Sequence, residues 1–193
     1  MLGRVCRISV IVVACALAGS VPAAHAQEKV QVTEYELKGA YLYKFTQYVE
    51  WPKSAADESF VIGVLGKDPF GDILDQIARE RKIKGKPVII RRFDSSDDYK
   101  PCHILFIAPE GANGGKNESP VERLEAVKKK IKGAPPLLVG DSEGLAEKGA
   151  VFNFYPEGKG YRFEVNHEAA KRADIKVDVR LIKMGKIVSE KKD

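Results

Sequence analysis

The strongest constraint on the fold is a short run in mid-chain that is apolar at every position after its first residue, residues 103–107. Successive side chains of a strand point to opposite faces of its sheet, so a strand of this kind must be covered on both faces. Similar short runs occur at residues 60–65, 87–91 and 136–140. They alternate with segments of helical periodicity, which is typical of an α/β protein with a largely parallel sheet.

The helices between these runs have recognisable starts. Thr33 and Glu36 form a capping-box pattern, as do Ser119 and Glu122, and Asp68-Pro69 offers an N-cap and a first-turn proline. The first helix is expected to run to Trp51, where Pro52 ends it. Its predicted apolar face recurs at three- and four-residue steps and comprises Leu37, Ala40, Tyr41, Phe45 and Tyr48.

The alternation of apolar runs with helical segments ends after Ala150. Two β-rich runs, 151–155 and 161–165, flank the sequence Pro-Glu-Gly-Lys-Gly, which is typical of a hairpin. We therefore predict a single three-layer α/β domain with a mostly parallel sheet, an antiparallel C-terminal hairpin and helices on both faces.

Residues 1–26 are predicted to be a secretory signal peptide. Arg4 and Arg7 precede an apolar run at 8–18, and Ala24-His25-Ala26 fits a cleavage site. Cleavage before Cys15, as in a lipoprotein, is a weaker alternative because the core before it would be short. The apolar run is shorter than the roughly 20 residues that span a bilayer, and no later run approaches that length, so we expect no membrane span in the mature chain. Residues 27–193 would form the exported domain.

Charge and cysteine content narrow the function classes. The predicted mature chain has 30 Lys and Arg against 27 Asp and Glu, and a surplus of three does not indicate nucleic-acid binding. Cys102 is its only cysteine, so no internal disulfide is expected.

Residues for catalysis or metal binding are scarce. The mature chain has two histidines, His103 and His167, with no ligand pair at helical spacing, so no metal or cofactor is expected. There is no nucleophile elbow, and Cys102 has no evident base. We therefore predict no catalytic residues, and we interpret His103 as structural.

Two loops are candidates for ligand binding because they follow buried strands, where α/β sheets form their crevices. The first contributes Lys67, Asp68 and Gly71, and the second contributes Asp141 and Ser142. The alternative for the second loop is an acidic cap without a ligand.

The first helix is unusually aromatic. Tyr43, Tyr48 and Trp51 are candidate partner-binding residues, because aromatic side chains carry much of the energy of protein interfaces. The alternative is that these rings are ordinary core.

Several motifs in order resemble the YfiR family of periplasmic regulatory proteins, also described as YfiR/HmsC-like. The resemblance begins with Lys-Gly-Ala-Tyr-Leu-Tyr-Lys-Phe at 38–45, Val-Glu-Trp-Pro at 49–52 and Val-Leu-Gly-Lys-Asp-Pro-Phe-Gly at 64–71. It continues through Cys-His-Ile-Leu-Phe-Ile at 102–107 and Leu-Val-Gly-Asp-Ser-Glu-Gly at 138–144, and it covers about residues 34–188.

The resemblance implies a periplasmic, non-enzymatic regulator, usually a homodimer. Such a protein binds the periplasmic sensor region of an inner-membrane signalling protein, a diguanylate cyclase in the best-understood case, and lowers cyclic-di-GMP output. The alternative is a small-molecule-binding sensor component that acts with a sensor kinase.

The chain departs from the family at one physically important position. Family members commonly have a cysteine where this chain has Gly63, able to bridge to the cysteine that matches Cys102. Redox control through an internal bridge is therefore not expected here, and Cys102 is expected to be unpaired.

Overall fold

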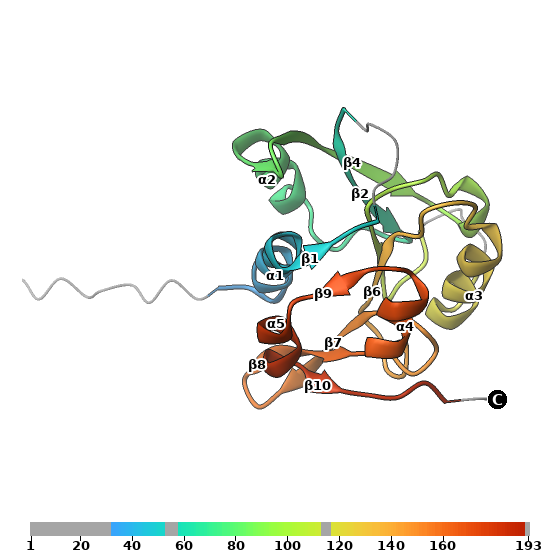
Figure 1. The fold of residues 1–193 in the computed structure, drawn as a ribbon. Coiled ribbons are helices and arrows are strands. Elements are labelled where there is room, and N and C mark those ends of the chain that lie inside the picture. Colours follow the sequence, from blue (N-terminus) through green and yellow to red (C-terminus); the bar gives the residue numbers. More distant parts are fainter. Residues whose placement is uncertain (1–31, 53–57, 113–116, 192–193) are drawn as a thin grey trace, which may run out of the picture. The chain divides into compact units, whose positions relative to one another are not determined.

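The computed structural model describes residues 32–52, 58–112 and 117–191, so the predicted signal peptide lies outside the described residues (Figure 1). The helices are α1 (Glu34–Tyr48), α2 (Ile73–Glu80), α3 (Pro120–Lys130), α4 (His167–Arg172), α5 (Val179–Met184) and the short 3-10 helix η1 (Ser96–Asp98). The strands are β1 (Val49–Glu50), β2 (Phe60–Leu65), β3 (Lys82–Ile83), β4 (Lys86–Phe93), β5 (Ile104–Ile107), β6 (Leu137–Gly140), β7 (Phe152–Glu157), β8 (Gly160–Val165), β9 (Lys176–Val177) and β10 (Lys186–Ile187).

Eight strands form the central sheet in the order β10-β8-β7-β6-β5-β2-β4-β3. Neighbours are parallel except at β7–β8 and β3–β4, which are antiparallel. This confirms the predicted mostly parallel sheet and its antiparallel C-terminal hairpin. The two remaining described strands, β1 and β9, pair separately in an antiparallel ribbon.

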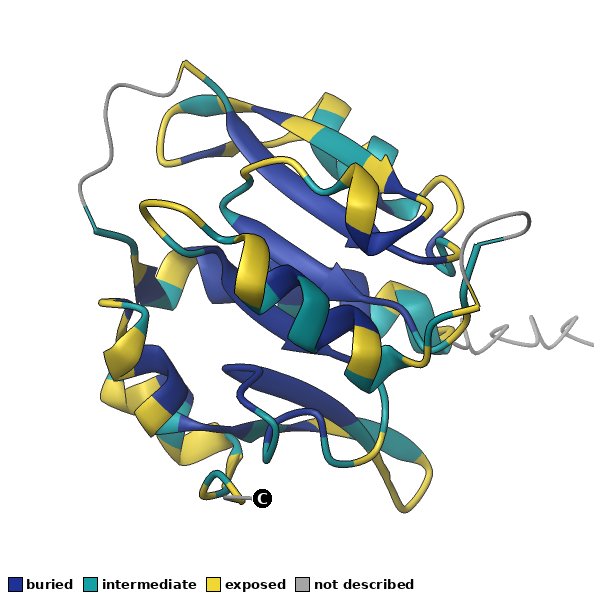
Figure 2. Cartoon of the chain, turned by 90° about the vertical axis from the view of Figure 1, so that its right-hand side faces the viewer, coloured by how far each residue is buried: buried dark blue, intermediate teal, exposed yellow. Residues whose placement is uncertain are grey.

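The central strands are buried on both faces (Figure 2). In β5, Ile104 and Phe106 pack into one apolar cluster with α1, α2, α4 and α5, whereas Leu105 and Ile107 pack into a second cluster with α3. This alternation follows from the two-residue period of a strand. It confirms three layers with helices on both faces.

Two helix starts carry the capping boxes expected from the sequence, and a third is capped by an asparagine. Thr33 and Ser119 each accept a hydrogen bond from the backbone of the glutamate three residues on, which completes a capping box, and the Asn166 side chain accepts from Ala169 N. Each such cap stabilises its helix by about 1 kcal/mol.

The prediction for the first helix was wrong at its end. Helix α1 ends at Tyr48, because the backbone turns into β1 and pairs with β9 before it reaches Pro52. Its predicted apolar face is also rotated, since the buried residues are Lys38, Gly39, Leu42, Phe45 and Thr46. Gly39 explains the rotation: a Cβ there would lie 2.9 Å from Ile73 Cγ2 of α2, so the glycine lets the two helices approach.

The predicted start of the second helix was wrong as well. Helix α2 begins at Ile73 rather than after Asp68. The Asp68 carboxylate instead accepts a hydrogen bond from Phe70 N, and Gly71 has φ +54°. A turn in this left-handed region separates the loop from the helix.

Candidate functional site

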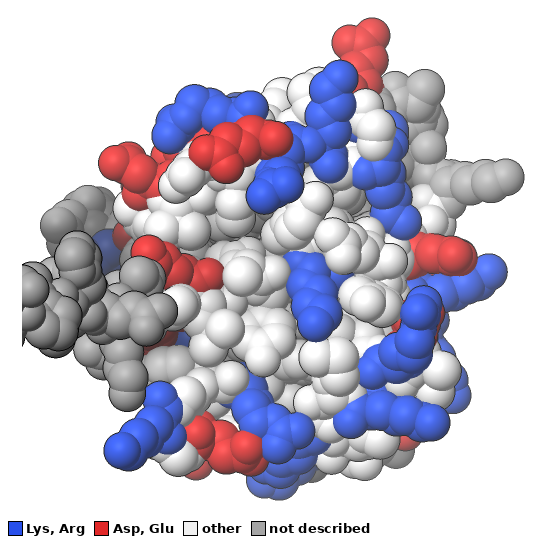
Figure 3. All heavy atoms as spheres, turned by 90° about the vertical axis from the view of Figure 1, so that its left-hand side faces the viewer, with Lys and Arg blue, Asp and Glu red and all other residues white. Residues whose placement is uncertain are grey.

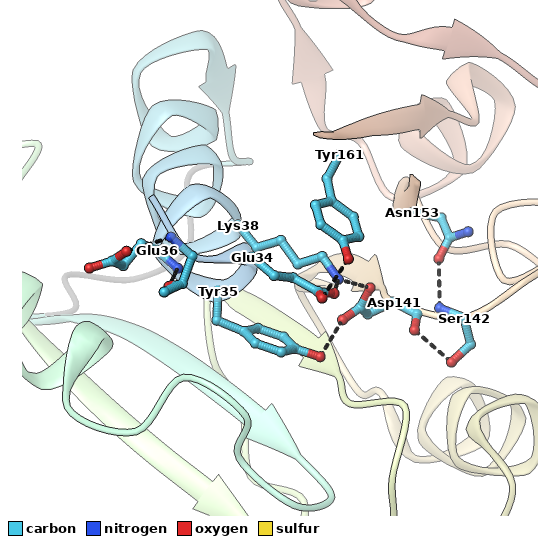
Figure 4. A network of polar contacts seen from close by, with 9 residues as sticks. Glu34, Tyr35, Glu36, Lys38, Asp141, Ser142, Asn153 and Tyr161 are labelled. Carbon is cyan, nitrogen blue, oxygen red and sulfur yellow. Dashed lines mark hydrogen bonds and ion pairs between the residues drawn. The ribbon is translucent and has the colours of Figure 1, made fainter. Parts of the chain in front are cut away.

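A buried ion pair lies at the carboxyl edge of the sheet. Asp141 directly follows β6, and Lys38 reaches it from α1 with 2.5 Å between Nζ and Oδ1. The Lys38 and Asp141 side chains are only 2% and 7% exposed, and the Lys38 ammonium also contacts Glu34 one helical turn earlier. Figure 4 shows these groups converging from α1 and the β6 loop.

Aromatic side chains complete this network. Tyr35 donates its hydroxyl hydrogen to Asp141 at 3.2 Å, and Tyr161 of β8 donates to Glu34 at 2.6 Å (Figure 4). The Lys38 Nζ lies 4.8 Å from the Tyr35 ring centre and 4.5 Å from that of Tyr161. The lysine cation is thus held by two carboxylates and by ring faces, which attract cations electrostatically.

The electrostatics of the two carboxylates differ because their burial differs. Burial raises the pKa of Asp141 above its ordinary value, and the hydrogen bond and charge of Lys38 oppose this only in part. Burial also acts to raise the pKa of Glu34, but hydrogen bonds from Lys38 and Tyr161 outweigh it and hold that pKa below its usual value. The network therefore anchors the first turn of α1 to the sheet.

Asp141 and Ser142, from the second of the two loops proposed for ligand binding, belong to this network. Tyr35 connects the two loops, since it bonds Asp141 and packs edge to face on Phe70. Ser142 N donates to Asn153 Oδ1 at 3.3 Å, and its hydroxyl donates to the Asp141 carbonyl.

The other loop is more exposed. Lys67 pairs with Glu110 at 2.8 Å, and the Asp68 carboxylate accepts from Arg92 Nε at 2.7 Å. The Gly71 carbonyl accepts from the same arginine at 3.4 Å. Ligand binding by these residues and by Asp141 and Ser142 stays a prediction.

Sequence reasoning missed Lys38. The signal was present, because Lys38, Leu42, Phe45 and Val49 follow one another at steps of four, three and four along one helix face. A lysine in phase with three apolar residues is buried only with a partner, and Asp141 follows an apolar strand. The pattern alone could not pair the two residues.

The candidate partner-binding residues lie at the other end of α1 and just beyond it. Tyr43, Tyr48 and Trp51 are half-buried, and each packs against the apolar cluster beneath α1. Each ring also has a cation over it: the guanidinium carbons of Arg81 and Arg180 lie 6.0 and 5.1 Å from the ring centres of Tyr43 and Tyr48, and Lys84 Nζ lies 5.5 Å from that of Trp51. We call these three rings and three cations the aromatic surface.

Basic side chains are prominent on this side of the molecule. Figure 3 views the side on which α1, α2 and α5 lie in Figure 1, and outside the grey atoms Lys and Arg predominate there over Asp and Glu. The aromatic surface thus combines aromatic rings with positive charge.

Trp51 and Cys102 line one pocket of about 450 Å³. Trp51 Nε1 donates to the His103 carbonyl at 2.7 Å, and its ring packs edge to face on Phe60. The His103 ring accepts from Val61 N at 3.0 Å, which confirms its structural role. The structure therefore brings Trp51 and Cys102 together and places them at the sheet edge opposite Asp141.

Cys102 is a free thiol in an apolar setting. Burial raises the pKa of the Cys102 thiol to about 12, although Arg91 acts in the opposite direction.

We predict that at pH 8 the native Cys102 thiol reacts with Ellman's reagent at least about a hundredfold more slowly than the unfolded chain, because the thiolate is the reactive form. Since the folded pKa is raised, the thiol's contribution to stability is full below about pH 9 and is lost as the pH rises towards 12. Equal rates for native and urea-unfolded protein would contradict this.

Within residues 32–52, 58–112 and 117–191, no group of three or more His, Cys, Asp or Glu side chains could hold a metal ion. None of the helices in the same ranges is long and apolar enough to span a membrane.

Comparison with known proteins gives a family and a fold. A family model described as YfiR/HmsC-like matches residues 35–186. Among curated proteins, no match was found.

Two solved structures share the fold. One is the ABC domain from Streptococcus pneumonia in complex with L-Trp, with a TM-score of 0.52 and 8% identity over 80% of this chain. The other is a conserved domain protein from Vibrio cholerae O1 biovar El Tor, with a TM-score of 0.52 and 12% identity over 81% of this chain. The chain spans 62% and 60% of their lengths.

Proposed function

The chain belongs to the YfiR/HmsC-like family, and we propose that it is a periplasmic, non-catalytic regulator that binds the periplasmic sensor region of an inner-membrane diguanylate cyclase and represses it. Family membership supports a periplasmic regulator of this kind of signalling. The partner, the repression and a homodimeric state are parts of the proposal.

The aromatic surface is the observation that carries partner binding. Tyr, Trp and Arg are the residue types enriched among the residues that dominate binding energy. Here Tyr43, Tyr48 and Trp51 keep part of each ring exposed, while their inner edges are fixed against the core. Fixed rings lose little conformational entropy on binding, which favours affinity.

The charge of the surface indicates the chemistry of the partner. Arg81, Lys84 and Arg180 lie over the three rings. A complementary surface would present carboxylates next to apolar side chains, because like charges across an interface are costly. We therefore expect an acidic, partly apolar face on the sensor region.

Deletion of the gene tests the proposal in the cell. We expect cyclic-di-GMP to rise in the deletion strain and to return to its original level when the protein is supplied with its export signal. The same protein without residues 1–26 should not restore repression, because it would not be exported. Unchanged cyclic-di-GMP in the deletion strain, together with membranes that capture no signalling protein on the purified chain, would contradict the proposal.

Tyr43 tests the surface itself. Replacing it with alanine is expected to weaken binding to the sensor region by more than about 1 kcal/mol, roughly fivefold, if the ring is an interface anchor. Isothermal titration calorimetry measures the affinity.

The matched control is Tyr155→Ala. Tyr155 is also half-buried and has a cation over its ring, Lys186 Nζ at 5.5 Å, but it lies on the β7–β8 hairpin. Its removal should leave the affinity unchanged. Equal affinities for wild type and Tyr43→Ala would show that Tyr43 is a core residue and not an interface anchor.

A further inference from the structure

The pocket that contains Trp51 lies at the amino edge of the sheet. It is lined by Val61 near the start of β2 and by His103 and Pro135, which precede β5 and β6. These three strands are parallel, so their starts share one edge, opposite the edge that carries Asp141. The volume of the pocket, about 450 Å³, lies within the range of small-molecule sites, about 300–1,000 Å³.

Two cations line this pocket without carboxylate partners. Arg91 and Lys132 both lie in its wall, and neither makes an ion pair with any residue that the structure describes. The described lining includes no Asp or Glu. The neighbouring Arg92 is different, since it pairs with Asp68 and Asp75. The pocket is therefore a concave site of positive charge, which attracts anions.

Apart from His103, the rest of the wall is apolar, and two of the lining side chains are already held in place. The Trp51 ring is held by its N–H bond to the His103 carbonyl and by edge-to-face packing on Phe60. Arg91 is positioned by one hydrogen bond, from its Nη1 to the Pro101 carbonyl at 3.1 Å, which leaves other N–H groups to donate. Preorganised walls of this kind reduce the entropy lost on binding.

We propose that this pocket binds a small organic anion with a flat, apolar body. Arg91 and Lys132 would bind the carboxylate, sulfonate or phosphate group, and the body would pack on Trp51 and the neighbouring prolines. A small molecule fits better than an acidic side chain of a protein partner, because an aspartate or glutamate has no flat apolar body to cover these walls. The site shares Trp51 with the aromatic surface but is separate from the Asp141 network, and it does not depend on the identity of the signalling partner.

Calorimetric titration with 2-naphthoate tests the site. We expect saturable 1:1 binding to the purified protein. The neutral analogue 2-naphthamide should bind at least about tenfold more weakly, because it lacks the charge that Arg91 and Lys132 recognise. Arg91→Gln and Lys132→Gln should each weaken naphthoate binding, the first by about tenfold or more. Trp51 is the only tryptophan of the sequence, so a changed tryptophan fluorescence lifetime on binding would place the ligand at this pocket.

Arg79→Gln is the matched control, since Arg79 is an exposed arginine of α2 outside the pocket lining. It should bind 2-naphthoate like the wild type. If Arg91→Gln fails to fold, Lys132→Gln decides, because Lys132 is exposed and makes no hydrogen bond or ion pair within the described part of the chain.

Three results would overturn the proposal: no saturable binding at millimolar 2-naphthoate, equal affinity for 2-naphthamide, or unchanged affinity in the folded pocket variants. If the first of these results is found and Arg91→Gln also weakens binding of the sensor region, the pocket is assigned to an acidic residue of the partner instead. A failure of the regulatory function alone leaves these titrations unchanged, so the two proposals are distinguishable.

Discussion

Replacing Lys38 with methionine is expected to destabilise the protein by about 3–5 kcal/mol. Methionine retains most of the apolar stem, so the main loss is the cation that neutralises Asp141, whose side chain is only 7% exposed. Removing one partner of a buried ion pair leaves an uncompensated buried charge, and this is the cause of the large cost. Urea unfolding, followed by circular dichroism, measures the difference.

Two further variants identify the ion pair as the cause. Lys44→Met changes a half-buried lysine of α1 that makes no ion pair with the described residues, and it should alter stability by less than about 0.5 kcal/mol. The double variant Lys38→Met, Asp141→Leu should recover much of the loss, because an apolar pair of similar volume replaces the charged one. Equal effects of Lys38→Met and Lys44→Met would contradict the account.

The cost of Lys38→Met should depend on pH. Burial already raises the pKa of Asp141, and loss of the Lys38 charge removes the main group that opposes this. An aspartate whose pKa is raised by folding contributes stability fully below the unfolded value, about 3.9, and loses it as pH rises through the folded value. The variant should therefore be closest to the wild type near pH 4 and furthest from it at pH 7. Unfolding curves at both values test this, and a cost that is larger at pH 4 would contradict it.

Introducing a cysteine at Gly63 is expected to create a disulfide with Cys102. A Cβ built on Gly63 would lie 3.1 Å from Cys102 Sγ, close to the separation of about 3 Å between Cβ and the partner sulfur across a disulfide. Closing a loop of about 40 residues should stabilise the oxidised form by about 4 kcal/mol over the reduced form. Urea unfolding with and without reductant measures this difference.

The reduced variant should itself be less stable than the wild type by about 1–3 kcal/mol. The new Cβ would lie 2.9 Å from both Leu105 Cδ1 and Phe93 Cε2, so the core must shift to admit it. Gly63→Ala is the control, because it adds the Cβ without the thiol and should show no effect of reductant. Two free thiols on residues 27–193 of Gly63→Cys after oxidation would show that the bridge does not form.

Much of the fold could be predicted because its signals are local. The strand at residues 104–107 is apolar at every position, and the capping boxes at Thr33 and Ser119 involve residues three apart. The exact face of α1 could not be predicted, because the contact that sets it joins Gly39 to Ile73 in another helix. Its end could not be predicted either, because β1 forms only by pairing with β9, more than a hundred residues later.

The candidate site was harder to predict from the sequence, because its contacts also join distant segments of the chain. Asp141 was identified from its position after a buried strand, but Lys38 lies 103 residues away, and no local pattern pairs the two residues. Tyr43, Tyr48 and Trp51 were identified by residue type, whereas the cations over them come from other parts of the chain. Contacts between distant segments leave little trace in local periodicity.

The most direct test of the proposed function is the rate of cyclic-di-GMP synthesis by the full-length cyclase in proteoliposomes, measured while purified protein is added on the side of the sensor region. The account predicts that synthesis falls saturably with added protein, and that Tyr43→Ala requires about fivefold more protein for the same effect while Tyr155→Ala behaves like the wild type. A rate of synthesis that stays constant up to concentrations far above those expected in the periplasm would contradict it.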